Sequence, residues 1–328
     1  MKPQIYVTRT LPQAGLDLLA EEYDVEVNPY DRVATREELL AGIKGKDALL
    51  CLLTESIDSE IMDAEPRLKV IANYAVGFNN IDVAAATERG IPVTNTPGVL
   101  TQTTADLAFA LIMACARRVV EADEFMRAGK YEGWGPMLLL GRDIHGKTLG
   151  LVGFGRIGQA MAQRGLGFNM KILYNDAVRA PEELERAYNA EYRELPDLLQ
   201  ESDFVSLHVP LMESTHHLIS DAQFALMKTT AILINTSRGP VVDEKALVRA
   251  LKEGAISGAG LDVFEREPQF EPGLERLANV VMVPHIASAS VETRTKMATM
   301  AAENACAAIR GETPPNIVNP EVWDKRRR

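Results

Sequence analysis

Three charged residue types in the second half of the chain could together transfer a proton and bind an anion. Arg238 ends the run AILINTSR, and His285 ends the run VVMVPH. Glu265 and Glu267 stand between them in GLDVFEREP. A histidine can donate a proton near neutral pH, a carboxylate on its other ring nitrogen favours the charged ring, and an arginine can bind a carboxylate through two hydrogen bonds. This set suits reduction of a 2-keto acid by hydride, in which the carbonyl oxygen gains a proton.

Each of these residues also has a purely structural interpretation. Most arginines are solvated, and a single histidine at a strand end is more often structural than chemical. Position favours chemistry here, because Arg238 and His285 both follow apolar runs, and open α/β sheets bind ligands beyond the carboxyl ends of their strands. His208 ends another such run and could line a cofactor cleft.

A nucleotide cofactor that could supply the hydride is predicted by the stretch GLVGFGRIG. Gly153, Gly155 and Gly158 have the G-x-G-x-x-G spacing, directly after an apolar strand pattern and before a helix pattern. The glycines permit a tight turn and let backbone N–H groups approach a pyrophosphate at the helix N-terminus. That context makes the short motif specific.

The nucleotide type is predicted by Asp176, which ends the next apolar run. It lies close to the spacing of about 20 residues at which an acid binds the ribose hydroxyls. A carboxylate there repels a 2′-phosphate, so we expect NAD to be preferred, although NADP remains possible because Arg179 is near. The alternative is that Asp176 only caps a helix.

The elements that must position these residues follow a repeated order. Short apolar runs alternate with helical patterns over residues 4–96, and a second such series covers residues 147–285. This order is typical of parallel sheets covered by helices, and the continuous apolar runs are typical of strands buried on both faces. Residues 101–126 predict one long helix that is too apolar to face solvent, and residues 290–312 predict another.

We therefore predict an α/β fold with two Rossmann-like domains and parallel sheets. Residues 1–98 and 288–328 are expected to form a discontinuous, flavodoxin-like substrate-binding (catalytic) domain. Residues 99–287 are expected to form an inserted NAD-binding Rossmann domain. Two crossings between domains would allow a hinge.

Composition excludes several classes of function. A length of 328 residues favours two domains, and a net charge of −11 argues against a nucleic-acid or anionic-membrane surface. The basic run DKRRR predicts only a solvated tail. The chain has no apolar signal core or spanning stretch, so we expect a cytoplasmic protein.

The three cysteines, Cys51, Cys115 and Cys306, lie in apolar patterns. They fit buried thiols better than disulfides or metal ligands, and no metal site is expected.

The chain resembles the D-isomer-specific 2-hydroxyacid dehydrogenases over nearly its whole length. The likeness is carried by NYAVGFNNIDVAAATERGIPVTNTPGVL, TADLAFALIMACARRVVEAD, GKTLGLVGFGRIGQAMA, AILINTSRG, GAGLDVFEREP and VPHIASAS. The resemblance implies a homodimeric, NAD-dependent enzyme, and it is strongest for members that reduce glyoxylate to glycolate. It assigns catalysis to Arg238, Glu267 and His285, with His285 as proton donor. Glu267 is preferred to Glu265 because the family's acid immediately precedes the proline.

The resemblance also assigns the residues that bind substrate and cofactor. The substrate carboxylate is expected on backbone amides of Val76 and Gly77, and Arg238 is expected to bind it as well. Asn80 replaces a common aspartate in that loop, which bears on its internal hydrogen bonds. The expected cofactor contacts are Gly153, Gly155, Arg156, Ile157, Gly158, Asp176, Val209, Pro210, Thr236, Ser237, Asp262 and Ala287.

Related activities remain open. Hydroxypyruvate reductase, or D-glycerate dehydrogenase, differs only by a hydroxymethyl group on the substrate, and an extra carbon is worth about 1–3 kcal/mol of discrimination. Glu267 argues against formate dehydrogenase, where glutamine stands, and Val76 argues against phosphite oxidation, where lysine stands. From a different class, a dinucleotide-sensing co-regulator without enzymatic activity remains an alternative.

Overall fold

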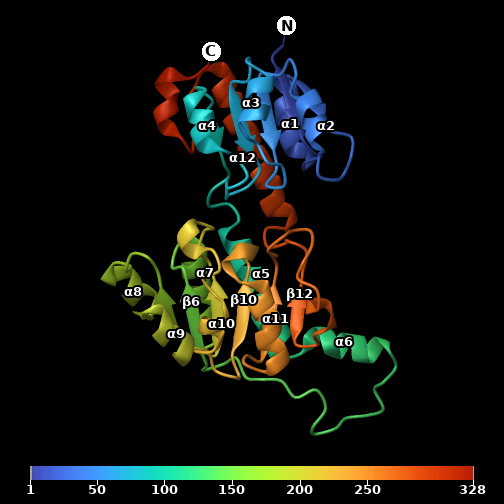
Figure 1. Ribbon diagram of the computed structural model, residues 1–328, viewed down its shortest axis with the longest axis vertical. Helices are drawn as coiled ribbons and strands as arrows, with labels where there is room; N and C mark the ends of the chain where they lie inside the picture. Colours follow the sequence, from blue (N-terminus) through green and yellow to red (C-terminus); the bar gives the residue numbers. More distant parts are fainter. Residues whose placement is uncertain (1, 328) are drawn as a thin grey trace. The chain divides into compact units, whose positions relative to one another are not determined.

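The computed structural model describes residues 2–327, which divide into two compact units. One unit runs up to Leu100 and resumes at Ala289, and the other comprises Thr101–Ser288. Each unit has a single sheet in which every strand pair is parallel (Figure 1). The predicted α/β class and the two parallel sheets are confirmed. None of the described helices is long and apolar enough to cross a membrane.

The first unit has a five-stranded sheet in the order β2-β1-β3-β4-β5, which is the flavodoxin-like order. Its strands are β1 (Gln4–Val7), β2 (Asp24–Val27), β3 (Ala48–Cys51), β4 (Val70–Asn73) and β5 (Val93–Thr94). Its helices are α1 (Gln13–Glu22), α2 (Arg36–Gly42), α3 (Ser59–Ala64), α4 (Val83–Glu88) and α12 (Val291–Arg310), and a 3₁₀ segment, η4 (Pro320–Lys325), follows.

Helix α12 brings the end of the chain back onto the first unit. Ser290 caps its first turn, and Gly311, with a φ of 81°, ends it. It packs so closely on α1 that a Cβ on Gly15 would lie 2.7 Å from the Cβ of Ala298. The described part of the C-terminal tail also differs from the predicted solvated run, because Arg326 stacks on Trp323 at 3.9 Å. Arg328 lies outside the described residues.

The second unit has a seven-stranded sheet in the order β12-β11-β10-β9-β6-β7-β8. Its strands are β6 (Thr148–Val152), β7 (Lys171–Asn175), β8 (Ala190–Tyr192), β9 (Phe204–Leu207), β10 (Ile232–Asn235), β11 (Gly258–Leu261) and β12 (Val280–Met282). Its helices are α5 (Thr101–Ala116), α6 (Val119–Arg127), α7 (Arg156–Gly167), α8 (Glu182–Tyr188), α9 (Leu195–Glu201), α10 (Asp221–Phe224) and α11 (Glu244–Glu253). The order reverses between β6 and β9, so the cofactor crevice is expected at the carboxyl ends of these strands.

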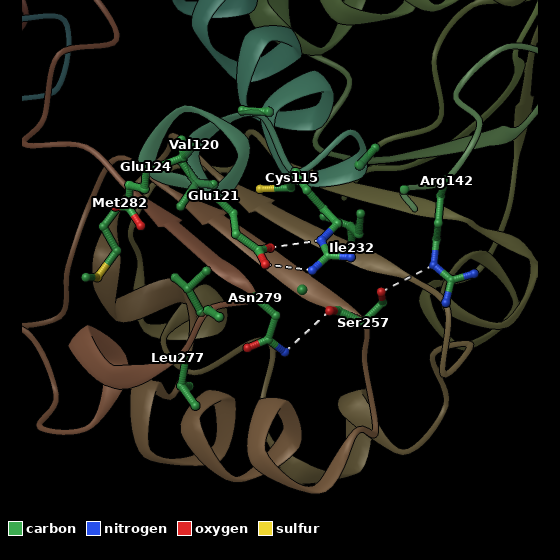
Figure 2. A pocket seen from close by; sticks show the side chains of 18 of the residues that line it. Cys115, Val120, Glu121, Glu124, Arg142, Ile232, Ser257, Leu277, Asn279 and Met282 are labelled. Carbon is green, nitrogen blue, oxygen red and sulfur yellow. Dashed lines mark hydrogen bonds and ion pairs between the residues drawn. The ribbon is translucent and has the colours of Figure 1, made fainter. Parts of the chain in front are cut away.

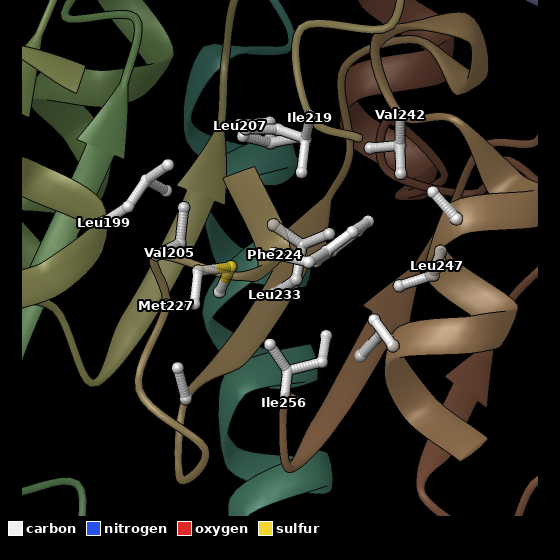
Figure 3. Packing of buried hydrophobic residues seen from close by; sticks show 14 of the residues in the cluster. Leu199, Val205, Leu207, Ile219, Phe224, Met227, Leu233, Val242, Leu247 and Ile256 are labelled. Atoms are coloured by element: carbon white, nitrogen blue, oxygen red, sulfur yellow. The ribbon is translucent and has the colours of Figure 1, made fainter. Parts of the chain in front are cut away.

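The inner strands β6, β9, β10 and β11 are buried on both faces, as their apolar runs predict, whereas the edge strands β8 and β12 are partly exposed. Leu233 of β10 packs into a cluster with helices α9, α10 and α11, part of which is drawn in Figure 3. Its neighbours Ile232 and Ile234 pack into a second cluster with α5 and α7. The two layers hold the strand ends, and the residues that follow them, in a rigid frame.

The single long helix expected over residues 101–126 is wrong. Helix α5 ends at Ala116 because Arg118 takes a left-handed conformation with a φ of 53°. The Arg142 N–H donates to the Ala116 carbonyl at 2.7 Å and so caps the last turn from outside the helix. Glu121 binds the Arg118 guanidinium at 2.6 and 2.8 Å. Helix α5 is largely buried, whereas α6 buries none of its residues.

Candidate active site

Arg238, Glu267 and His285 follow three adjacent strands of the second unit. Arg238 lies after β10, Glu267 in the loop after β11, and His285 after β12. Because the strands are parallel, all three residues lie at the carboxyl edge of one sheet. The structure thus places close together three residues that are far apart in the sequence.

His285 and Glu267 form a direct pair. The His285 Nδ1 lies 2.8 Å from Glu267 Oε2, and the other oxygen of Glu267 accepts the Phe264 N–H at 3.0 Å. Burial raises the pKa of the Glu267 carboxyl, but the hydrogen bond and charge of His285, the Phe264 N–H and the charge of Arg238 outweigh it, so this pKa is lowered. Glu267 is therefore a carboxylate at neutral pH, and the Nε2 of His285 is free to face a substrate.

Glu265 is bound elsewhere, although it lies only two residues away. Its Oε1 lies 3.1 Å from His217 Nε2, and its Oε2 accepts the Glu244 N–H at 3.3 Å. The buried Glu244 carboxylate in turn accepts the Glu265 N–H at 2.6 Å. These contacts hold one end of the loop that carries Glu267, a function that sequence reasoning did not assign to Glu244.

Arg238 is held by a turn that sequence reasoning also missed. Asn235, buried at the end of β10, donates to the Arg238 carbonyl at 3.0 Å and accepts from the Ser237 N–H and hydroxyl at 3.0 and 2.8 Å. Gly239 follows, and a Cβ there would overlap the Phe264 carbonyl, so the two loops touch through their backbones. Burial lowers the pKa of the Arg238 guanidinium, and the charge of Glu267 opposes that effect. A partly desolvated guanidinium beside the His285–Glu267 pair is suited to bind an anionic substrate.

The glycine loop has the geometry that a dinucleotide requires. Gly153 has a φ of 96°, and a Cβ there would lie 2.7 Å from the His208 backbone. A Cβ on Gly158 would overlap the Gly153 carbonyl, whereas Gly155 faces open space. Gly155 is the N-cap of α7, which begins at Arg156, so the first N–H groups of this helix can bind phosphate.

Two polar groups near this loop fit the rest of the cofactor. Asp176 follows β7, and its Oδ2 accepts the Phe154 N–H at 2.7 Å, which leaves its other oxygen for a ribose. The Thr236 hydroxyl is buried after β10 without a hydrogen-bond partner, and such a group is expected to bond a ligand or water. These observations show that the residues present fit a nicotinamide dinucleotide.

Asp262 lies inside the turn that carries His285. Its two oxygens accept the N–H groups of Ile286 and Ala287 at 2.6 and 2.9 Å, and its backbone carbonyl accepts the His285 N–H. Burial, together with the charge of Glu267, raises the pKa of Asp262 to about 6, although the two N–H donors and the charge of His285 oppose that rise. Asp262 therefore orders the His285 turn in addition to the cofactor contact expected of it.

His208 does not have the environment of a proton donor. Its Nε2 lies 2.9 Å from the Ser206 hydroxyl, and burial lowers its pKa to about 3, so the ring is neutral. Its backbone packs against Gly153, next to Val209 and Pro210.

Val76 and Gly77 belong to the first unit, in the loop after β4. The Asn95 and Asn73 side chains donate to their carbonyls, each at 2.8 Å. Asn80 donates to the carbonyls of two further residues, which an aspartate could not do. The departure at Asn80 therefore adds hydrogen bonds that brace this loop.

Comparison with known proteins places the chain in a family. Residues 109–287 match the model for the NAD-binding domain of the D-isomer specific 2-hydroxyacid dehydrogenases. The chain belongs to this family. It is an NAD(P)-dependent dehydrogenase that acts on small 2-hydroxy or 2-keto acids.

The relatives of this dehydrogenase match it over nearly its full length. A glyoxylate reductase of Korarchaeum cryptofilum is 56% identical over 98% of this chain and 97% of its own, and one of Thermococcus litoralis is 52% identical over 98% of each. Among solved structures, the TT0316 protein of Thermus thermophilus has a TM-score of 0.89 and 47% identity, over 96% of this chain and 99% of its own. An NADPH-dependent glyoxylate/hydroxypyruvate reductase of Sinorhizobium meliloti, in complex with NADP and malonate, has a TM-score of 0.86 and 32% identity, over 100% and 99%.

A pocket of about 740 Å³ in the dehydrogenase's second unit is separate from this site (Figure 2). Ile232, Gly258 and Val280, which line it, are the first residues of β10, β11 and β12. It therefore lies at the amino edge of the sheet, whereas Arg238 and His285 lie at the carboxyl edge. In the part of the chain that the structure describes, no cluster of three or more His, Cys, Asp or Glu could hold a metal ion.

Proposed function

We propose that this dehydrogenase reduces glyoxylate to glycolate with NADH, with His285 as the proton donor. The observation that carries the proposal is the 2.8 Å pair between His285 and Glu267 at the sheet edge that also presents Arg238. Relatives named glyoxylate reductase, at 50–56% identity over nearly the full length, support the substrate. Hydroxypyruvate is the second candidate substrate, because the solved relative from Sinorhizobium meliloti is named a glyoxylate/hydroxypyruvate reductase.

Each residue has a defined chemical role in this mechanism. Arg238 binds the substrate carboxylate and polarises the carbonyl, and the Val76 and Gly77 amides of the first unit are the further groups proposed for carboxylate binding. A bound nicotinamide supplies the hydride. The Nε2–H of protonated His285 donates its proton to the carbonyl oxygen, while Glu267 holds the ring through Nδ1 and stabilises its charge. In the reverse direction neutral His285 accepts the proton.

The cofactor is proposed to lie on the glycine loop, with its pyrophosphate on the N–H groups of Gly155, Arg156 and Ile157. Asp176 would bind the ribose, and Thr236 and Ser237 would contact the dinucleotide from the end of β10. Val209 and Pro210 would line the same crevice, and Asp262 and Ala287 would border the nicotinamide.

With the cofactor in this place, we propose residues 99–287 as the NAD-binding domain, and residues 1–98 with 288–328 as the substrate domain.

We also propose that the enzyme is a cytoplasmic homodimer. Exposed apolar side chains gather in the second unit along residues 119–140, and such patches mark interaction surfaces. They are Val119, Val120, Met126, Tyr131, Trp134, Met137, Leu138 and Leu140. Trp134 is 83% exposed, and Val120 and Leu140 border the pocket in Figure 2. Light scattering should give the mass of two chains.

The substrate is tested with a panel of 2-keto acids and both reduced cofactors. We expect the highest kcat/KM for glyoxylate with NADH, and measurable turnover of hydroxypyruvate. A clearly higher value for a larger keto acid would contradict the assignment. Absence of turnover on every keto acid would favour the alternative of a dinucleotide-sensing co-regulator.

Asp176→Ser should improve the use of NADPH relative to NADH. The substitution removes the charge that would face a 2′-phosphate and one acceptor for the ribose hydroxyls. The ratio of kcat/KM for the two cofactors measures the change. Asp197→Ser, an acidic residue in the first turn of α9, is the control for net charge. If wild type already prefers NADPH, Asp176 does not select the cofactor.

Glu267→Gln should move the pH at which reduction slows to a lower value. Reduction requires protonated His285, so kcat/KM falls as pH rises, and the Glu267 carboxylate delays that fall because it stabilises the charged ring. The lowered pKa of Glu267 means that this charge is present above that pKa and is lost only as pH falls through it. Glutamine removes the charge at every pH. Glycolate oxidation needs the neutral ring, so its kcat/KM should have the opposite pH dependence and increase as pH rises.

Glu265→Gln is the matched control for that experiment, because Glu265 stands in the same loop but pairs with His217. Its pH profile should equal that of wild type. Equal profiles for Glu267→Gln and wild type would remove Glu267 from proton transfer.

A further inference from the structure

Arg179, three residues beyond Asp176, is bound by a glutamate of the next helix. Its Nε lies 2.8 Å from Glu185 Oε1, and its Nη2 lies 3.0 Å from Glu185 Oε2. Both nitrogens on that side of the guanidinium are therefore occupied by one carboxylate. This two-point geometry is also the one that binds a phosphate.

Glu185 is itself anchored to the core. The hydroxyl of Tyr174, which is fully buried, donates to Glu185 Oε1 at 2.6 Å and accepts the Ala180 N–H at 3.0 Å. The Glu185 side chain is only 13% exposed, whereas that of Arg179 is 65% exposed. Hydrogen bonds from Arg179 and then Tyr174 lower the pKa of Glu185 to about 2, so its charge persists over the working pH range.

The pair lies beside the expected ribose site. The Tyr174 ring stacks on Phe154 at 4.3 Å, and the Phe154 N–H donates to Asp176. Arg179 lies 5.8 Å from the Tyr192 ring, and the charges of both Arg179 and Asp176 act on the Tyr192 hydroxyl. The guanidinium is thus within the same small group of side chains as the acid that would bind the ribose.

A 2′-phosphate at this site needs a cation, and in dinucleotide-binding folds a nearby arginine provides it. Arg179 is the right chemical type, but Glu185 neutralises its charge and occupies the Nε and Nη2 donors that would bind a phosphate at two points. We propose that Glu185 is a cofactor-specificity residue, which withholds Arg179 from the 2′-phosphate and so adds to the preference for NAD(H) that Asp176 creates. The inference rests on the proposed cofactor site at the glycine loop.

Glu185→Gln tests the proposal with little risk to the fold. Glutamine keeps an oxygen that can accept from Tyr174 but removes the charge that binds Arg179. Exposed ion pairs are worth up to about 1 kcal/mol, so the Kd for NADPH, measured by calorimetry, should fall about three- to fivefold. The Kd for NADH should stay unchanged, and far-UV circular dichroism should match that of wild type.

Glu182→Gln is the matched control, because it removes the same charge from the same helix. Glu182 is 82% exposed and lies 3.8 Å from Arg186, not from Arg179. Its Kd for NADPH should equal that of wild type. In the double variant Glu185→Gln/Arg179→Gln, the gain in NADPH affinity should disappear.

The outcomes separate this inference from the function on which it rests. An NADPH Kd for Glu185→Gln equal to that of Glu182→Gln would overturn the inference, as would a gain that survives the loss of Arg179. In both cases wild type still binds NADH, and the proposed function stands. A wild-type enzyme that binds neither cofactor would overturn both.

Discussion

His285→Ala is expected to lower kcat for glyoxylate reduction by about 10²–10⁴-fold, the usual contribution of a positioned acid. The ring that would donate the proton is held by Glu267 at 2.8 Å, and alanine offers no group that could replace it. The Kd for NADH should be largely retained, since the glycine loop and Asp176 lie on other strands of the sheet. Single-turnover rates, under conditions in which chemistry limits the rate, measure the effect.

His217→Ala is the matched control for His285→Ala. His217 also pairs with a glutamate of the 264–271 loop, but with Glu265 rather than Glu267. We expect its single-turnover rate to stay within a few-fold of wild type. A His285→Ala enzyme with near-normal turnover would show that the proton comes from another group, and the proposed mechanism would fail.

Arg238→Gln should lower kcat/KM for glyoxylate by about 10²–10³-fold, mainly through a higher KM. Hydrogen bonds to charged groups contribute about 1.5–3 kcal/mol each, and glutamine removes both the charge and the two-point geometry. The turn built by Asn235 should survive, because Asn235 bonds the backbone of Arg238 and Ser237, whereas glutamine removes the bond from the Arg238 Nη1 to the Ser237 carbonyl at 2.7 Å. Steady-state kinetics over a wide range of glyoxylate concentrations separate KM from kcat.

Arg266→Gln provides the comparison for Arg238→Gln. Arg266 is in the loop that carries Glu267, but it is exposed and pairs with Glu271 at 2.8 Å. Its KM should be close to that of wild type. If both variants show the same KM as wild type, Arg238 does not bind the substrate.

The sequence by itself determined the class of fold and the edge of the sheet at which chemistry is expected. Alternating apolar and helical patterns predict parallel sheets, and parallel strands necessarily end at one edge, so Arg238 and His285 could be placed together without a structure. The roles of the glycine motif and of Asp176 could also be predicted from the sequence. Both depend on short segments that are neighbours along the chain and are neighbours in the fold as well.

The break after Ala116 could not be read from local sequence. Residues 101–126 are compatible with one helix throughout, yet Arg118 is left-handed, and the last turn of α5 is capped by Arg142, which lies beyond both helices in the sequence. Local propensity decides where a helix can form, but packing against other segments decides where it ends.

Only the tertiary structure shows directly which charged groups are partners, because the residue pattern left Glu265 and Glu267 open and only the family resemblance favoured Glu267. Glu265 and Glu267 are the same residue type two positions apart, and the path of their loop gives one to His217 and the other to His285. In the same way, nothing in the sequence around Arg179 shows that this residue pairs with Glu185, or that the buried Tyr174 hydroxyl donates to the same glutamate. Hydrogen bonds depend on distances of about 3 Å and on direction, and the backbone sets both only after the strands and helices have packed.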